Sequence, residues 1–269
     1  MTTGATEPSH RPAVTVVGSL NLDLLVTVGR LPGRGETVVG SASATAPGGK
    51  GANQAAAAGV LCNGSSGGGG VSGGAAMVGR VGDDAVGRDL IADLSARGVD
   101  TSPILTTSAA LTGHATVAVE SAGGENLIIV APGANALLSA ADVDVPVVRD
   151  ARVVLAQLEV PLATVLAAVA VARGTVVLNP APSQPLPKEL LERVDVLVPN
   201  EWELAQLAGA APGRHEVDEL ATMARQVSSR DVVITLGARG ALVVPGTADP
   251  TGDAVAGEPV LVAPPAVHP

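Results

Sequence analysis

The apolar residues of this chain gather in short runs that alternate with longer segments of helix-forming residues. Six runs are almost continuously apolar, which is typical of strands buried on both faces of a sheet. They are residues 13–17, 75–79, 153–156, 175–178, 194–198 and 232–236. The predicted helices are 85–97, 140–149, 162–172, 201–208 and 216–228. Strands that alternate with helices predict an α/β fold built on a parallel sheet.

Four further segments are predicted as strands, the first two because apolar and polar residues alternate in them and the last two as a hairpin around Gly123-Gly124. They are residues 24–28, 37–45, 116–120 and 126–130. Turns rich in glycine separate the members of each pair. The pair near 22–45 is expected to form a small β-sheet that stands off the main sheet.

The composition bounds the number of domains and the nature of the core. The 269 residues suit one α/β domain, predicted over 13–269, and 46% of them are hydrophobic. There is no Phe or Tyr and one Trp, so the core must consist of Val, Leu, Ala and Ile. The polar residues 1–12 are expected to form a disordered tail, and the Gly/Ser-rich residues 63–74 a surface loop.

Charge and cysteine content exclude several classes of partner. The formal net charge is −10 without any basic run, which argues against nucleic acid and anionic membranes as partners. The most apolar helical segment, 162–172, is too short to span a bilayer. Cys62 is the only cysteine, so no disulfide can form within the chain, and we predict a cytoplasmic location.

The stretch from Gly48 to Gln54, Gly-Gly-Lys-Gly-Ala-Asn-Gln, carries the strongest candidate chemistry. Its glycines allow close approach to the backbone, and it opens onto a run of helix-forming alanines. Because the first N–H groups of a helix lack partners within it, we expect a pocket for a polar or anionic molecule beside Lys50. Ala44 and Gly51 exclude a Walker A loop. A tight loop before a packed helix is the alternative interpretation.

Polar side chains also follow the predicted strands at their carboxyl ends, where open α/β sheets bind ligands. The amide of Asn21 and the carboxylate of Asp23 suit sugar hydroxyls, although an Asx turn would also explain this pair. The other polar residues at these ends are Gln157, Glu159, Asn179, Asn200 and Thr235. Their gathering at one edge of the sheet predicts a binding site there.

Two later stretches are candidates for contacts with a nucleotide and a metal. Glu203 lies three residues after Asn200, which fits either a helix capping box or a carboxylate beside a hydrated magnesium ion. Residues 235–240 place a glycine turn after a strand, where a phosphate can approach the backbone. Turns of this kind are common, so this motif alone is weak.

The motifs occur in a fixed order along nearly the whole chain. They are Gly18–Asp23, Pro32–Thr37, Gly48–Gln54, Gly82–Gly87, Gln157–Pro161, Asn179–Pro182, Asn200–Glu203 and Thr235–Gly240. With this set the chain resembles the ribokinase-type (PfkB) carbohydrate kinases. The Asn21/Asp23 pair with Gly-Gly-Lys-Gly-Ala-Asn is more similar to ribokinases than to fructokinases or adenosine kinases.

The resemblance implies a three-layer fold, with a parallel sheet flanked by helices and a small β-sheet lid, with strands near 22–45 and 114–130, that often forms a homodimer. It implies transfer of phosphate from ATP to the primary 5-hydroxyl of D-ribose, with Mg²⁺ as cofactor and K⁺ as activator. It assigns the sugar to Asn21, Leu22, Asp23, Gly49, Lys50, Gly51, Ala52, Asn53 and Glu159. It assigns ATP to Asn200, Thr235, Leu236, Gly237, Ala238, Arg239 and Gly240, and magnesium, through water, to Glu203.

The family places its catalytic base in a Gly-Ala-Gly-Asp motif, which does not occur in this sequence. By the resemblance that motif would follow Pro269, so we expect the C-terminal part of the fold, with the base and most of the K⁺ site, to be absent. Thr251-Gly252-Asp253-Ala254 precedes no predicted helix and is expected to be a surface hairpin instead. Three hypotheses remain: a ribose kinase, a kinase for another sugar or nucleoside, and a non-catalytic sugar- or nucleotide-binding protein.

Overall fold

The computed structural model of the protein describes residues 12–63, 73–247 and 257–264. The predicted tail up to residue 11, most of the Gly/Ser-rich loop, and residues 251–254 lie outside the described residues.

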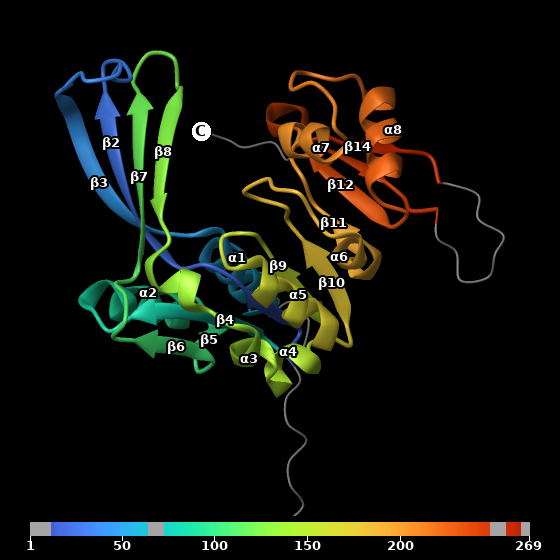
Figure 1. Ribbon diagram of the computed structural model, residues 1–269, viewed down its shortest axis with the longest axis horizontal. Helices are drawn as coiled ribbons and strands as arrows, with labels where there is room; N and C mark the ends of the chain where they lie inside the picture. Colours follow the sequence, from blue (N-terminus) through green and yellow to red (C-terminus); the bar gives the residue numbers. More distant parts are fainter. Residues whose placement is uncertain (1–11, 64–72, 248–256, 265–269) are drawn as a thin grey trace, which may run out of the picture.

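A ten-stranded sheet forms the centre of the molecule (Figure 1). Its main path runs in the order β14-β13-β12-β11-β10-β9-β1-β4-β5, and β6 pairs with β4. The strands are parallel except for β13 and β14, which pair antiparallel at one edge. Their bounds are β1 Val14–Val17, β4 Ala75–Gly82, β5 Val99–Asp100, β6 Ile104–Thr107, β9 Val153–Ala156, β10 Thr175–Leu178, β11 Val196–Leu197, β12 Asp231–Thr235, β13 Ala241–Val244 and β14 Val260–Val262.

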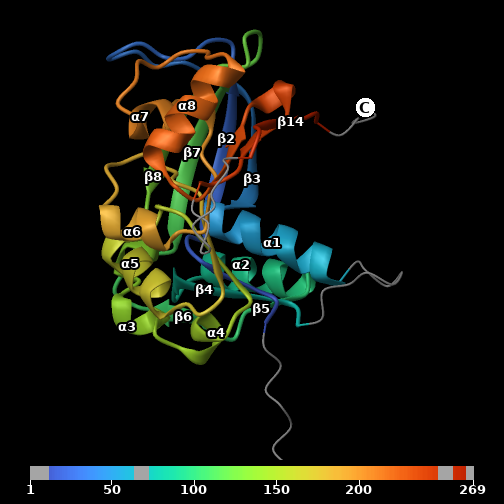
Figure 2. The same cartoon turned by 90° about the vertical axis from the view of Figure 1, so that its right-hand side faces the viewer.

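Helices lie on the two faces of this sheet (Figure 2). Two separate clusters of buried apolar residues form the cores. On one face α1 (Lys50–Asn63) and α2 (Ala85–Ala96) pack against β1, β4 and β5. The other face carries α3 (Ala140–Val143), α4 (Pro146–Arg149), α5 (Leu162–Val171), α6 (Lys188–Arg193), α7 (Glu201–Leu207) and α8 (Val217–Val227). The predicted three-layer α/β fold is confirmed.

Side-chain caps decide where several of these helices begin. The carboxylate of Asp84 accepts a hydrogen bond from the N–H of Gly87 and caps α2. Capping boxes start α7 at Asn200 and α8 at Glu216. The single helix predicted over 140–149 is wrong, because Pro146 cannot continue a helix and instead opens α4 after a short break.

A second, four-stranded sheet stands away from the main body (Figure 1). It has the order β3-β2-β7-β8, with β2 (Asn21–Val28) parallel to β7 (Gly113–Glu120) and the outer pairs antiparallel. The outer strands are β3 (Gly40–Gly48) and β8 (Asn126–Ala131). This sheet, which we call the lid, confirms the predicted small sheet. Its strand β3 runs later than predicted and ends directly before α1.

Four short elements of the described residues were not predicted. They are β5, β6, α6 and the 3-10 turn η1 (Gly133–Leu137). The two residues of β5 are too few to show the alternating pattern of a strand. Pro185 and Pro187, which precede α6, suggest a loop rather than a helix. The strand predicted over 194–198 is paired only at Val196 and Leu197. Within the described residues, no helix is both long and apolar enough to cross a membrane.

Beyond β9 the two faces of the main sheet differ in burial. Val154, Val176 and Val232 are completely buried under the layer from α3 to α8. Their neighbours Val153 and Val177 point to the opposite face and are only partly buried. The layer formed by α1 and α2 therefore covers the first strands of the sheet better than the later ones.

This difference predicts unequal costs for one substitution at adjacent positions. Val154→Ala should lower the free energy of unfolding by about 2 kcal/mol, because it empties space in a closed core. Val153→Ala, on the more open face, should cost less than about 1 kcal/mol. Urea unfolding followed by circular dichroism measures both values. Equal losses would contradict the unequal cover of the two faces.

Candidate active site

Asn21 and Asp23 lie at the root of the lid, immediately after the end of β1. Both residues belong to the ladder of β2, so they do not form the Asx turn considered from the sequence. The Oδ1 atom of Asp23 is buried and has no hydrogen-bond partner in the described part of the chain. Burial raises the pKa of the Asp23 carboxyl, the charge of Glu159 raises it further, and Lys50 opposes both effects. The site therefore holds one acceptor that the protein itself leaves unused.

Glycines allow the segments of this site to approach closely. A Cβ atom on Gly48 would lie 2.1 Å from the Cγ of Asp23, and one on Gly51 would lie 2.5 Å from the backbone nitrogen of Ser19. Gly49 has a φ of 89°, and its added Cβ would lie 2.9 Å from the nitrogen of Asn21. These glycines seat the start of α1 on the turn between β1 and β2.

The protein itself occupies the amino end of α1. The Lys50 N–H donates to the Oε2 of Glu159 at 2.9 Å, and the Gly51 N–H donates to the Oγ of Ser19 at 3.2 Å. The Ala52 N–H donates to the carbonyl of Ser19 at 2.8 Å. These N–H groups are therefore bonded within the chain, and a carboxylate of the protein takes the place of an anion at this helix start.

The remaining predicted sugar-site residues surround this helix start. The Lys50 ammonium lies 3.9 Å from the Oε1 of Glu159 and stays partly exposed. Asn53 is exposed on the first turn of α1, whereas Ala52 is buried and Leu22 is partly buried. The structure thus brings the charged and amide side chains of the predicted site together.

At the far end of the same edge, Asn200 and Glu203 form the capping box of α7. The Oδ1 of Asn200 accepts from the Glu203 N–H at 2.7 Å, and the Oε2 of Glu203 accepts from the Asn200 N–H at 2.8 Å. Asn200 also bridges to Thr235 at the carboxyl end of β12. Trp202, the single aromatic residue of the chain, lies half-exposed in the same first turn of α7.

Glu203 fits a hydrated magnesium ion better than a directly coordinated one. Its side chain is largely buried, and within the described residues its Oε1 atom has no hydrogen-bond partner. The described part of the chain holds no cluster of three or more His, Cys, Asp or Glu side chains around a common point. Magnesium commonly keeps several waters and takes one or two carboxylates together with phosphate oxygens, which matches this single carboxylate.

The predicted glycine turn from Thr235 to Gly240 forms a 3-10 turn over Gly237–Arg239. The Leu236 N–H donates to the carbonyl of Gly240 at 2.8 Å, and Gly240 has a φ of 90°. The guanidinium of Arg239 points back to the protein, where its Nη2 lies 2.6 Å from the Oε2 of Glu201. The charge of Arg239 is therefore already paired with Glu201. The groups of the turn that can still contact a ligand include the backbone groups of Ala238 and the glycines.

Glu201 connects this turn with two neighbouring segments. Its second oxygen accepts a hydrogen bond from the His215 N–H in the loop before α8, and the Nη1 of Arg239 donates to the carbonyl of His215. Burial alone would raise the pKa of the Glu201 carboxyl, but the bonds from His215 and Arg239 together lower it.

A cleft of about 460 Å³ extends from the start of α1 to the start of α7. Lys50 and Gln54 from α1 line one side of it, and Asn200, Glu203 and Thr235 line another. Asn179, at the carboxyl end of β10, completes the wall. Lys50, assigned from the sequence to a sugar, and Asn200 and Thr235, assigned to a nucleotide, therefore face one common space.

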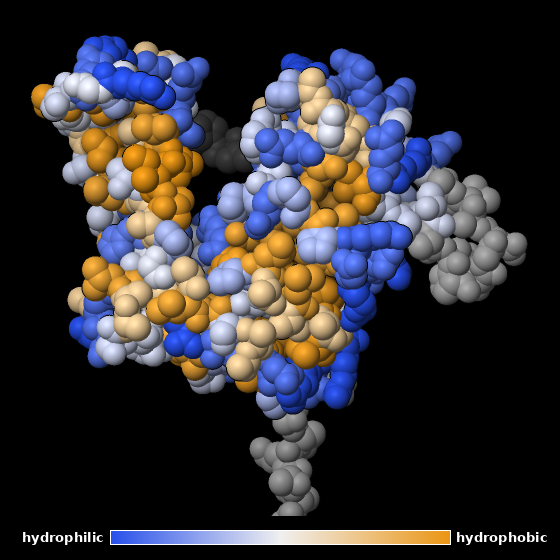
Figure 3. All heavy atoms as spheres, viewed as in Figure 1, coloured by the Kyte–Doolittle hydropathy of each residue, from blue (hydrophilic) through white to orange (hydrophobic). Residues whose placement is uncertain are grey.

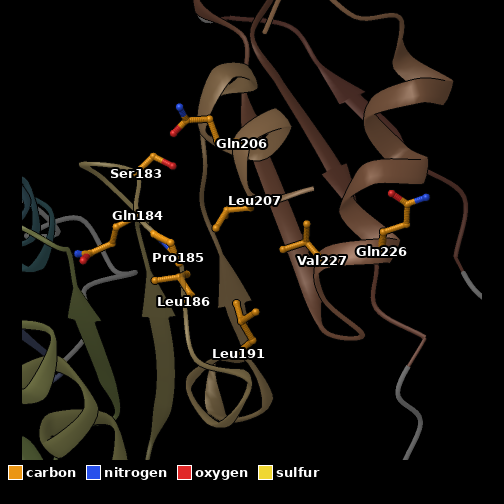
Figure 4. Close-up of a pocket in the computed structure, with 9 residues that line it drawn as sticks. All are labelled: Ser183, Gln184, Pro185, Leu186, Leu191, Gln206, Leu207, Gln226 and Val227. Atoms are coloured by element: carbon orange, nitrogen blue, oxygen red, sulfur yellow. The ribbon is translucent and has the colours of Figure 1, made fainter. Parts of the chain in front are cut away.

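A second cavity, of about 580 Å³, lies between residues 183–191 and the helices α7 and α8 (Figure 4). Leucine and valine side chains line it together with the side chains of Gln206 and Gln226. None of the residues that line it carries a side chain that titrates near neutral pH, so it offers no acid or base.

Ser19 and Asn135 were not predicted as site residues, and no hydrogen-bonding role was predicted for Gln54. Ser19 donates its hydroxyl to Glu159 at 2.6 Å, and Gln54 accepts from Gln157 at 2.7 Å. Asn135 contacts Asn21 from 114 residues away in the chain. Ser19 and Gln54 lie within the recognised motifs, but no local pattern marks Asn135.

Comparison with known proteins identifies the family. The sequence profile of the pfkB family carbohydrate kinases matches residues 11–258. The chain belongs to the pfkB family of carbohydrate kinases. This membership places it among the phosphotransferases that act on an alcohol group, and makes it a sugar kinase by descent.

Individual pfkB relatives are similar over most of the chain. The ribokinase of Staphylococcus aureus (strain COL) is 36% identical over 234 residues, which cover 84% of this chain and 73% of that protein. The solved structure of ribokinase from Giardia lamblia superposes with a TM-score of 0.77 at 30% identity, covering 87% of this chain and 73% of that one. Arabidopsis thaliana ribokinase, solved in complex with ribose and ATP, gives a TM-score of 0.74 at 30% identity, covering 94% and 78%.

The ion pair beside the glycine turn yields a pH-dependent prediction. Glu201→Gln should lower the free energy of unfolding by about 1–2 kcal/mol at neutral pH, since it weakens the bonds to Arg239 and His215. The folded pKa of Glu201 lies below its ordinary value of 4.5, so its contribution is complete above that value and is lost as the pH falls through the folded pKa.

Urea unfolding of the wild type and Glu201→Gln over a range of acidic pH values measures this contribution. The difference between them should shrink as the pH falls below about 4.5. Glu192→Gln serves as the matched control, because Glu192 pairs with Lys188 on an exposed face of α6. A difference for Glu201→Gln that is constant with pH would contradict the charged role of this residue.

Proposed function

We propose that this chain is an ATP-dependent kinase of D-ribose that phosphorylates the primary 5-hydroxyl group. The observation that carries this proposal is the common cleft, which Lys50 lines from the sugar half and Asn200, Glu203 and Thr235 line from the nucleotide half. Phosphoryl transfer requires an acceptor hydroxyl and a nucleotide phosphate to meet in line within one space. The ribokinase relatives support ribose and ATP as the two substrates.

In this proposal, the sugar binds among Asn21, Asp23, Lys50 and Glu159, with Asn53 at the exposed rim. Sugar hydroxyls both donate and accept hydrogen bonds. The unused oxygen of Asp23 supplies an acceptor, and the Lys50 ammonium supplies donors. The glycines Gly49 and Gly51, with Ala52 and Leu22, shape the floor of this half of the site.

ATP is proposed to bind at Asn200 and along the turn from Thr235 to Gly240. Glu203 would hold Mg²⁺ through water, and the ion would neutralise charge on the phosphates. Because the guanidinium of Arg239 is paired with Glu201, we assign the nucleotide contact of this residue to its backbone. K⁺ remains a proposed activator, and we assign no residue of the chain to it.

The proposed reaction moves the γ-phosphoryl group from ATP to the hydroxyl oxygen and leaves ADP, and the hydroxyl proton is released to the solvent. The chain's own residues bind and orient the two substrates and exclude water between them. We assign no general base among them. A cytoplasmic location and the exclusion of nucleic acid stay predictions.

The test measures binding and turnover separately. Isothermal titration with D-ribose and with Mg-ADP tests the two halves of the site, and ribose-dependent ADP release with Mg²⁺ and K⁺ tests the reaction. Binding with turnover supports the whole proposal. Binding of both ligands without turnover supports the sugar- and nucleotide-binding alternative, and stronger competition by another sugar or by adenosine would reveal a different acceptor. A folded chain that binds neither ligand overturns the proposal.

Two substitutions should separate the halves of the site. Asp23→Asn should weaken ribose binding by at least roughly tenfold, because it removes a charged acceptor, while the affinity for Mg-ADP stays within about twofold. Glu203→Gln should weaken the binding of Mg-ADP and leave ribose binding unchanged. Titration of each variant with each ligand measures this pattern. A variant that weakens both ligands equally would contradict the separate roles.

We also propose that two copies of the chain associate through their lids. Four consecutive residues of the edge strand β8, from Leu127 to Val130, are each between 45% and 61% exposed. Figure 3 shows apolar side chains gathered over the lid. An exposed apolar edge strand favours pairing with a partner, and a second copy offers the same surface.

Ile129→Asp tests this association, because it introduces a charge into the middle of the exposed strand. Size-exclusion chromatography with light scattering should show a dimer for the wild type and a monomer for the variant. Val60→Asp, at an apolar position on α1 that is 54% exposed, is the control and should remain dimeric. A monomeric wild type would contradict the proposed dimer.

A further inference from the structure

A buried amide lies directly behind Asn21. Asn135 belongs to the 3-10 turn η1 (Gly133–Leu137) that follows β8, and it is only 1% exposed. Its Oδ1 accepts from the Leu20 N–H at 2.9 Å. Its Nδ2 donates to the carbonyl of Leu20 at 3.1 Å and to the Oδ1 of Asn21 at 2.8 Å. Both N–H groups and the oxygen of Asn135 are therefore engaged.

The backbone of Leu20 dictates how both amides are oriented. A backbone N–H can only donate, so the atom of Asn135 that faces it must be the oxygen. The nitrogen of Asn135 then faces the Leu20 carbonyl and has one N–H left, which requires another acceptor. The atom of Asn21 beside it must therefore be Oδ1, and the NH₂ group of Asn21 must point away from Asn135.

The amide pair is also confined sterically. Gly113, at the start of β7, pairs with Asn21 in the lid ladder. A Cβ atom on Gly113 would lie 2.2 Å from the Oδ1 of Asn21 and 2.3 Å from the Nδ2 of Asn135. The two amides therefore pack against bare backbone, which restricts their rotation.

The NH₂ group of Asn21 is an unused donor beside an unused acceptor, the Oδ1 of Asp23. Within the described residues, the NH₂ group of Asn21 makes no hydrogen bond to the protein, and the Oδ1 of Asp23, two residues along β2, also lacks a partner. Alternate residues of a strand point to the same face of the sheet, so Asn21 and Asp23 face the same side. A hydroxyl group, which accepts and donates at once, complements such a pair.

We propose that Asn135 is a positioning residue that determines sugar specificity by fixing the Asn21 amide with its NH₂ group toward the ligand. The site then requires a sugar oxygen that accepts a hydrogen bond at Asn21, and it rejects a sugar that lacks that hydroxyl. This inference deepens the proposed sugar site and rests on ribose binding there.

Asn135→Asp tests the fixed orientation with little change in volume. The aspartate still accepts a hydrogen bond from the Leu20 N–H. Its second oxygen faces the Leu20 carbonyl and can only accept. It therefore favours the opposite orientation of the Asn21 amide, with the NH₂ group toward the new carboxylate. The ligand would then meet an oxygen. Isothermal titration of each variant with D-ribose and with its monodeoxy analogues measures the discrimination against each missing hydroxyl, and Mg-ADP reports on the other half of the site.

The wild type should bind one deoxy analogue at least roughly tenfold more weakly than ribose, since a donor is left without its partner. Asn135→Asp should bind ribose more weakly by a similar factor and should distinguish that analogue from ribose by less than about twofold. Its affinity for Mg-ADP should be unchanged. Asn63→Asp is the matched control, because Asn63 also donates to a backbone carbonyl, that of Gly98, but lies at the exposed end of α1.

A second variant keeps the inference testable if Asn135→Asp does not fold. Asn21→Asp keeps an acceptor for the Nδ2 of Asn135 but has no donor for the ligand, so it should show the same loss of discrimination. Retained discrimination in either folded variant overturns the inference, and so does an equal loss of affinity for ribose and Mg-ADP. A wild type that binds no sugar would overturn the proposed function, and with it the sugar site on which this inference rests.

Discussion

The carboxylate of Glu159 is the interaction on which the geometry of the site depends. Its Oε2 atom accepts from the Ser19 hydroxyl and from the Lys50 N–H, and so ties the segment after β9 to the turn after β1 and to the start of α1. Oriented N–H groups at a helix start stabilise a carboxylate there. The lid strands β2 and β3 leave from these same segments, so one side chain sets both the helix start and the lid's root.

Much of the site was predictable from the sequence because parallel strands bring their carboxyl ends to one edge. That rule is enough to collect Asn179, Asn200 and Thr235 around one cleft, and to place Asn21 and Asp23 just after the carboxyl end of β1. The rule does not say which polar groups are already bonded to other groups of the protein. The Lys50 N–H at the start of α1 donates to Glu159, the Arg239 guanidinium binds Glu201, and Asn135 binds Asn21 across more than a hundred residues. Such pairings depend on tertiary packing.

The fold was predictable where an apolar run was long or where a capping residue marked the start of an element. Buried β-branched runs gave the strands β1, β9, β10 and β12, and the capping box at Asn200 gave the start of α7. Prediction failed where tertiary pairing defines the element, as in the two-residue strand β5, which exists only through its ladder with β4. It also failed at Pro146, because this residue divides the predicted helix 140–149 into α3 and α4.

The lack of other aromatic side chains gives Trp202 an unusual position. It lies half-exposed on α7, two residues after the cap Asn200 and one before Glu203. With no tyrosine or second tryptophan in the chain, all of the intrinsic ultraviolet fluorescence comes from this turn. The emission is therefore blind to local changes in the lid and reports the polarity beside the α7 cap alone, so the protein carries a built-in optical probe at one end of its cleft.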